Sequence, residues 1–155
     1  MKEVKLRRYE NLLTVSGLGV IVFGLWSVIK TLLVLFMQED TLADMPDSTL
    51  IRVIFFTIIG LVLLVDLLLR LFVGLSARAE GFGKKKGVVY IVFAILLAIV
   101  SLISVGMIFF DMDEESIVEI IVSVIVEGTS LIVVIELLIA AFNVKKLKKE
   151  LGEVC

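Results

Sequence analysis

The stretch LVLLVDLLLRLF, residues 61–72, is almost entirely aliphatic, yet it contains Asp66 and Arg70. It belongs to an apolar block over residues 50–73, and an apolar stretch of about 18 residues or more is long enough to cross a bilayer as a helix. A helix of a soluble bundle needs a polar stripe along one side, and residues 61–65 offer none. The stretch therefore predicts a transmembrane helix that carries an aspartate inside the membrane.

Three further blocks of the chain have the same apolar character. They cover residues 12–37, 87–110 and 117–142. The composition agrees, because 60% of the 155 residues are hydrophobic and the mean hydropathy is +1.14, whereas soluble domains are only about half apolar. We therefore predict an all-α integral membrane protein, a single domain over residues 1–155 with four transmembrane helices in the lipid bilayer.

The charged residues are distributed unevenly between the connections. Lysine and arginine gather before the first block, in the connection at residues 74–86 and after the fourth block, whereas residues 38–49 and 111–116 contain neither. Short basic segments stay on the cytoplasmic side of a membrane. We predict a protein of the cell membrane with both termini and residues 74–86 inside and the two acidic connections outside.

The two halves of the chain resemble each other at an offset of 70 residues. GLGVIVFG in the first block falls over GVVYIVFA in the third, and Asp66 falls over Glu136. The match predicts a duplicated helical hairpin, residues 17–72 and 87–142, that is, two tandem hairpins related by a pseudo-twofold axis along the membrane normal. Coincidence between two aliphatic sequences is the alternative.

Ionisable side chains within the blocks need partners, because each costs about 2.5 kcal/mol or more at the centre of a membrane helix. Asp66 and Arg70 are one helical turn apart, so they can pair locally. Glu136 has Ala140 at the position that corresponds to Arg70. We expect Glu136 to use Tyr90, Arg70 of the neighbouring helix, a basic loop residue or its own proton.

The fourth block is the most polar of the four. Its polar side chains form two stripes on nearly opposite faces: Glu119, Ser123, Glu127 and Ser130 on one, and Thr129, Glu136 and Asn143 on the other. We expect Lys30 of the first block to pair with Glu127. A helix with two polar faces is expected at the centre of its bundle, or between its own bundle and a second copy or another membrane protein.

Several classes of function lack their usual residues. The chain has no histidine, and its only cysteine is the terminal Cys155. It has no metal-ligand cluster, no glycine-rich phosphate loop and no nucleic-acid-binding module. We therefore expect no enzyme, no cofactor, no metal and no nucleic-acid partner.

The intramembrane acids indicate a function by default, since such groups usually mark ion or proton pathways. They predict a cation or proton channel or transporter, with Asp66 and Glu136 as related carboxylates and Glu127 as a third candidate. The alternative is a non-catalytic accessory or scaffold subunit that self-associates, or holds another membrane protein, through the same buried polar residues. Binding of a lipid or hydrophobic ligand between the two halves is a third possibility.

Overall fold

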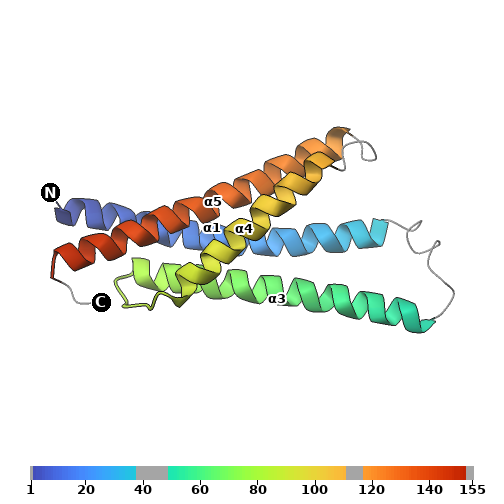
Figure 1. Cartoon of the computed structure of the whole chain (residues 1–155), viewed down its shortest axis with the longest axis horizontal. Coiled ribbons are helices and arrows are strands. Elements are labelled where there is room, and N and C mark those ends of the chain that lie inside the picture. Colours follow the sequence, from blue (N-terminus) through green and yellow to red (C-terminus); the bar gives the residue numbers. More distant parts are fainter. Residues whose placement is uncertain (1, 38–48, 111–116, 153–155) are drawn as a thin grey trace.

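The computed structural model describes residues 2–37, 49–110 and 117–152, and all regular structure over these residues is α-helical (Figure 1). The four helices are α1 (Lys2–Met37), α3 (Thr49–Gly81), α4 (Val89–Phe110) and α5 (Ile117–Glu150). Each of them is long and apolar enough to cross a membrane. The prediction of four apolar helices in an all-α chain is thereby confirmed. The acidic connections, apart from residue 49, and Cys155 lie outside the described residues.

The helix surfaces are covered by large aliphatic side chains. Leu61, Val62 and Ile132, for example, each leave more than half of their surface exposed. A soluble monomer rarely exposes contiguous apolar patches of more than a few hundred Å², whereas hydrocarbon accepts them. A helix also hydrogen-bonds its own backbone N–H and C=O groups. This is necessary in hydrocarbon, because no water is present there to bond with them. These surfaces indicate a small integral membrane protein.

Three helices run further than the apolar blocks. α1 already begins at Lys2, α3 continues to Gly81 and α5 continues to Glu150. The connection predicted over residues 74–86 is therefore shorter, because residues 74–81 belong to α3. This extra helix is held by packing, since Ser76, Ala77 and Glu80 are all buried.

Two glycines mark where these long helices end. Gly83 has φ +81° and its N–H donates to the carbonyl of Glu80 at 3.0 Å. Gly152 has φ +77° and its N–H donates to the carbonyl of Lys149 at 3.3 Å. A left-handed residue just past a helix is the usual way to satisfy its last carbonyls, and glycine adopts it without steric cost.

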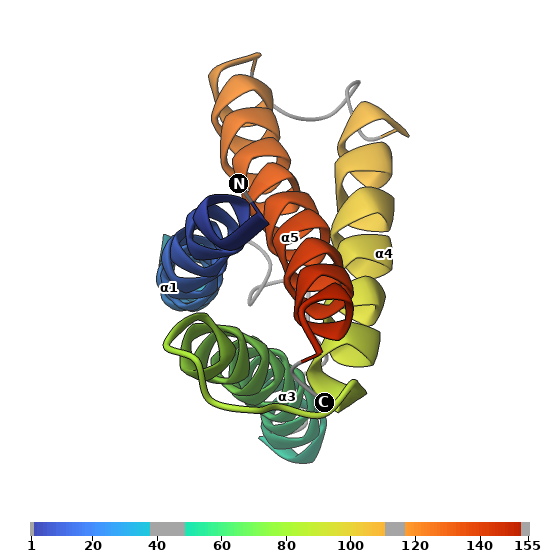
Figure 2. The same ribbon diagram turned by 90° about the vertical axis from the view of Figure 1, so that its left-hand side faces the viewer.

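The helices pack most closely at the end of the molecule that carries both termini. α1 lies against α3 and α5, α4 lies against α5, and α3 and α4 contact each other little (Figures 1 and 2). The α1 and α3 backbones approach so closely that a Cβ at Gly17 would lie 2.8 Å from the carbonyl oxygen of Gly74. Fully buried side chains from all four helices form one core cluster, which includes Leu13, Val20, Val73, Ala77, Tyr90, Leu137, Ala140 and Val144.

Toward the opposite end, α4 and α5 diverge from α1 and α3 (Figure 1). Every described residue of α3 from 53 to 69 is at least partly exposed, and so is every described residue of α5 from 121 to 129. We refer below to a packed end (residues 2–20, 70–97 and 130–152) and an open end (residues 21–33, 53–69, 102–107 and 121–129).

The internal repeat and its pseudo-twofold axis stay predictions. Contacts that such an axis would relate are unequal, because α1 packs along α5 whereas its counterpart α4 makes few contacts with α3. The single domain over residues 1–155 likewise stays a prediction.

Candidate functional site

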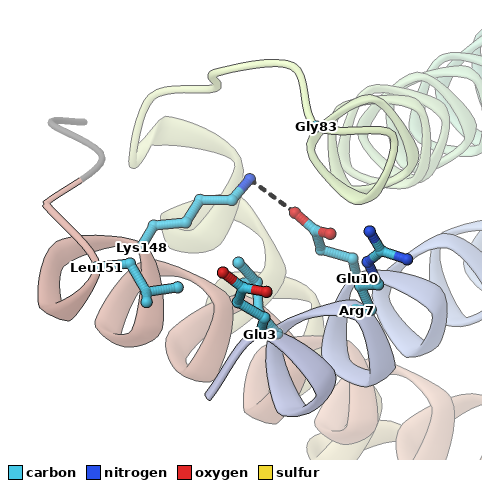
Figure 3. A pocket seen from close by; sticks show the side chains of 7 residues that line it. Glu3, Arg7, Glu10, Gly83, Lys148 and Leu151 are labelled. Atoms are coloured by element: carbon cyan, nitrogen blue, oxygen red, sulfur yellow. Dashed lines mark ion pairs between the residues drawn. The ribbon is translucent and has the colours of Figure 1, made fainter. Parts of the chain in front are cut away.

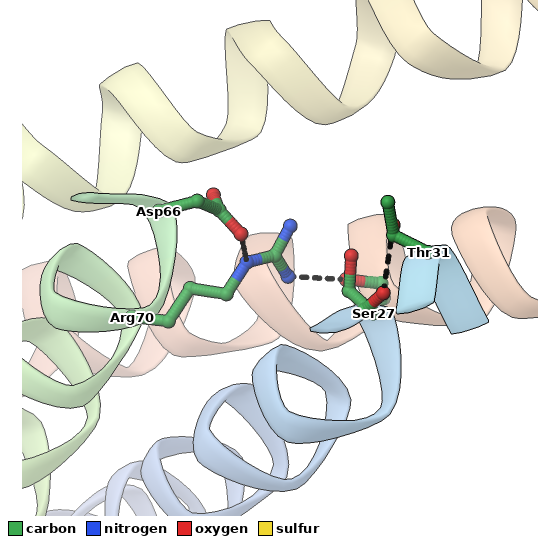
Figure 4. A network of polar contacts seen from close by, with 5 residues as sticks. Ser27, Thr31, Asp66 and Arg70 are labelled. Carbon is green, nitrogen blue, oxygen red and sulfur yellow. Dashed lines mark hydrogen bonds and ion pairs between the residues drawn. The ribbon is translucent and has the colours of Figure 1, made fainter. Parts of the chain in front are cut away.

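The ion pair expected from the spacing of Asp66 and Arg70 is present on α3, at the border between the packed and open ends. Nε of Arg70 donates to Oδ2 of Asp66 at 2.9 Å, and the two side chains are 7% and 27% exposed. The same guanidinium reaches α5, where Nη1 donates to Oγ of Ser130 at 3.1 Å (Figure 4). Arg70 therefore joins two helices as well as neutralising Asp66.

A glycine on α1 provides the space for Arg70. A Cβ at Gly24 would lie 2.8 Å from Cδ of Arg70 and 3.1 Å from its Cβ. The neighbouring turn of α1 carries Ser27 and Thr31, and the Thr31 hydroxyl donates back to the Ser27 carbonyl at 3.0 Å (Figure 4). The Arg70 side chain is thus enclosed by α1, α3 and α5, and the residue is buried.

A cavity of about 340 Å³ adjoins this ion pair. Its charged lining groups are Asp66, Arg70 and Glu127, and the hydroxyl-bearing residues Ser27 and Ser104 also line it. The rest of its wall is aliphatic. The structure therefore brings two of the three predicted carboxylates, Asp66 from α3 and Glu127 from α5, to one cavity.

Glu127 is the carboxylate of this cavity that makes no ion pair among the described residues. It is partly buried, and among the described residues it makes no ion pair or side-chain hydrogen bond. Lys30, its expected partner, instead donates from Nζ to Oγ of Ser123 at 3.0 Å. The predicted pair between Lys30 and Glu127 is therefore absent, because Lys30 extends to the α5 turn that precedes Glu127.

Glu136 does not join the site. Its side chain is exposed on the outer surface of α5, and within the described part of the chain it has no hydrogen bond or ion pair. Arg70 is turned toward Asp66 and Ser130. Tyr90 is buried, and the Lys145 ammonium lies 5.8 Å from its ring centroid. Neither named candidate partner therefore serves Glu136.

A second polar cluster, at the packed end, was not predicted. Lys145 lies 3.6 Å from Glu80, whose side chain is only 4% exposed, and it also donates to the carbonyl of Lys86 at 3.0 Å. Lys148 pairs with Glu10 at 3.0 Å beside a second cavity of about 530 Å³, which Glu3 and Arg7 also line (Figure 3). These contacts link α5 to α1 and α3, so they fasten the packed end.

The chemistry available in the cavity near Asp66 is that of charge and hydrogen bonding. No group of three or more His, Cys, Asp or Glu side chains lies together within residues 2–37, 49–110 and 117–152. Its lining holds two carboxylates and one guanidinium, and the guanidinium pairs with Asp66. Such a site suits one monovalent cation or a proton.

No family model, curated protein or solved structure matches the chain.

Proposed function

We propose that this chain is a small integral membrane protein that binds and passes a monovalent cation or a proton through the cavity beside Asp66. Glu127 and Asp66 are its binding carboxylates, and Arg70 is the internal counter-ion. The observation that carries the proposal is the composition of the lining, which holds two acidic side chains and one basic side chain, with the basic side chain paired to Asp66. Charged groups inside membrane segments face cavities or one another and mark ion and proton pathways.

The proposed orientation follows from the basic residues. Arg78, Lys84 and Lys145 all belong to the packed end or its connection, and short basic segments remain cytoplasmic. The packed end and both termini then lie inside the cell. The open end, with the acidic connections at residues 38–49 and 111–116, lies outside. The cavity is consequently an outward-facing chamber with the Asp66–Arg70 pair at its floor.

The ion pair between Asp66 and Arg70 provides a way to release the bound cation, because Arg70 can displace the cation from Asp66. A cation from outside meets Glu127, which has no local partner, and then competes with Arg70 for Asp66. Ser130 holds the guanidinium on α5, so Arg70 keeps a hydrogen-bond acceptor when Asp66 is engaged by the cation. The cost of leaving a charge unpaired in the membrane is thereby reduced at each stage.

The test is ion flux in proteoliposomes that contain purified protein. Proton movement is followed with an enclosed pH dye, and sodium and potassium movement with isotopes. We expect Asp66→Asn and Glu127→Gln each to lower the flux about tenfold or more, since each removes a charge from a poorly solvated site. The matched control, Glu136→Gln, makes the same chemical change outside the cavity and is expected to retain the flux. Unchanged flux in both cavity variants would refute the proposal.

A second candidate function rests on Glu136. Its side chain is exposed on α5, two helical turns from Thr129, which is also exposed. Thr129 and Asn143 donate to carbonyls of their own helix, so in hydrocarbon Glu136 is the member of this stripe that still needs a partner. A second copy or another membrane protein would provide one, as an accessory or scaffold subunit requires. This candidate predicts that Glu136→Leu dissociates the assembly in mild detergent, and that even the wild type shows no flux.

A further inference from the structure

The aliphatic wall of the cavity beside Asp66 is not explained by proton or metal-ion passage. A proton needs only a carboxylate and a path of water. Hard cations such as Ca²⁺ need about six to eight oxygen ligands, and the described residues bring no three carboxylates together. Val62, Leu69, Leu96 and Val100 nevertheless line a volume of about 340 Å³, which lies in the range of about 300–1,000 Å³ typical of pockets for organic ligands.

The charge of the lining sets the charge of the ligand. Asp66 is neutralised by Arg70 at 2.9 Å, whereas Glu127, also on the cavity, is without a cationic partner in the described part of the chain. One uncompensated carboxylate in a largely aliphatic chamber selects a single positive charge. An anion would meet Glu127 directly, and a neutral molecule would leave it unpaired at full desolvation cost.

We infer that the ligand of this cavity is a monovalent organic cation, a quaternary ammonium or similar onium group attached to an apolar body. The inference rests on the proposed function and names its substrate class. The positive group pairs with Glu127, and the apolar body packs against the leucines and valines of α3 and α4. These two helices contact each other little, so an apolar body can enter between them from the bilayer.

The choice of ligand also agrees with the energetics of desolvation. The cost of taking an ion out of water falls as the ion becomes larger and its charge more diffuse, because the solvation energy varies inversely with ionic radius. A small alkali ion would have to regain its hydration energy from Glu127, two serine hydroxyls and an Asp66 that Arg70 already engages. An onium group regains much less, and the burial of its apolar part adds a favourable term of its own.

Binding of benzyltrimethylammonium to the full chain in nanodiscs, measured by calorimetry, tests the inference. We expect saturable binding that Glu127→Gln weakens about tenfold or more and that Glu136→Gln leaves unchanged. Neopentylbenzene, in which carbon replaces the ammonium nitrogen, serves as the neutral control. It is expected to partition equally into nanodiscs with either variant.

A second pair of variants separates the cavity volume from its charge. Val100→Phe adds bulk on the cavity lining, whereas Ile99→Phe adds the same ring outside the lining at a position of similar exposure (46% for Val100 and 51% for Ile99). We expect Val100→Phe to weaken binding of the organic cation several-fold, and Ile99→Phe to leave it within about twofold, because only the first competes for the space of the apolar body. Circular dichroism is used to check that both variants remain helical.

The outcomes distinguish the ligand class from the function itself. Absence of organic-cation binding, together with proton or sodium flux that depends on Asp66 and Glu127, overturns the inferred ligand and keeps the proposed function. Absence of both overturns both. Binding that persists unchanged in Glu127→Gln and Val100→Phe also overturns the inference, since the ligand would then occupy another place.

Discussion

The packed and open ends of the molecule are both rich in aliphatic residues, yet the helices pack closely at only one of them. At the packed end the helices meet through small residues such as Gly17, Gly74 and Ala77. At the open end the surfaces carry large side chains such as Leu61 and Val62, which point outward. Leucine gains nothing by leaving hydrocarbon for another leucine, whereas small residues let helices approach closely. Close packing in this fold therefore follows the small residues and not the hydrophobicity.

The polar groups of the two ends differ in the same way. Glu80 and Glu10 of the packed end each have a lysine of α5 as partner. At the open end Lys30 has only a hydroxyl, and Glu127 has no ion pair among the described residues. Ion pairs join the helices at one end, and the carboxylate without an ion pair at the other is the one that we propose binds the cation.

The largest expected effect comes from adding a side chain where two helices touch. Gly17→Val places carbon atoms against the Gly74 carbonyl, 2.8 Å from the position of Cβ, so α1 and α3 must separate. We expect a loss of about 3 kcal/mol in the free energy of unfolding, measured by circular dichroism in mixed detergent–SDS micelles. The matched control is Gly60→Val at the open end of α3, where nothing lies within 4 Å. Equal losses for the two variants would contradict the claim that the helices pack more closely at the packed end than at the open end.

Removing Arg70 tests the border between the two ends. Arg70→Gln leaves Asp66 without its counter-ion and Ser130 without its donor, and we expect a loss of about 2–3 kcal/mol. The double variant Asp66→Asn with Arg70→Gln removes both charges and is expected to lose less than the sum of the single variants. Strict additivity would show that the pair contributes no coupling energy to the fold.

The ion pair between Glu80 and Lys145 is expected to contribute less, because it lies at the end of the bundle. Lys145→Met keeps the apolar part of the side chain and leaves Glu80 buried without its partner. We expect a loss of about 1–2 kcal/mol in the same unfolding assay. Replacing the nearby exposed Lys146 by Met is the control. A loss of similar size there would show that the effect does not come from the ion pair with Glu80.

The smallest expected effect is at the open end, where Lys30 donates to Ser123. Both side chains are partly exposed, so Lys30→Met is expected to change the free energy of unfolding by under about 1 kcal/mol. A loss of stability as large as that of Arg70→Gln would show that polar contacts hold the open end together as strongly as those at its border, which would contradict the difference between the two ends.

The number of helices and the local ion pair could be predicted from the sequence because they depend on short-range pattern. Four long aliphatic runs predict four helices, and a spacing of four residues predicts the pairing of Asp66 with Arg70. Arg70 also bonds to Ser130 of α5 and packs against Gly24 of α1. Contacts with other helices cannot be predicted from the spacing of residues within one segment. The helical turns of residues 74–81 could not be predicted for a related reason. The buried carboxylate of Glu80 is stabilised there by Lys145, which belongs to α5.

The positions of the acids show where sequence reasoning reached its limit. The offset of 70 residues pairs Asp66 with Glu136, but in space Asp66 shares its cavity with Glu127. Rotation of α5 about its axis decides which of its two polar stripes faces inward, and both stripes have helical spacing. The contacts of Ser123 and Ser130 settle that rotation, and they place Glu136 on the outside.

The central claim is that the open end holds a water-accessible chamber that faces the outside and reaches the Asp66–Arg70 pair. In a Cys155→Ser background, Ser104→Cys places a thiol on the lining of this chamber, and Ile99→Cys places one at an exposed site outside it. Intact cells are treated with a membrane-impermeant maleimide. We predict labelling of Ser104→Cys and none of Ile99→Cys, because the thiol reacts only where water and reagent reach it. Absence of labelling at position 104, or labelling only after the inner face is exposed, would contradict the account.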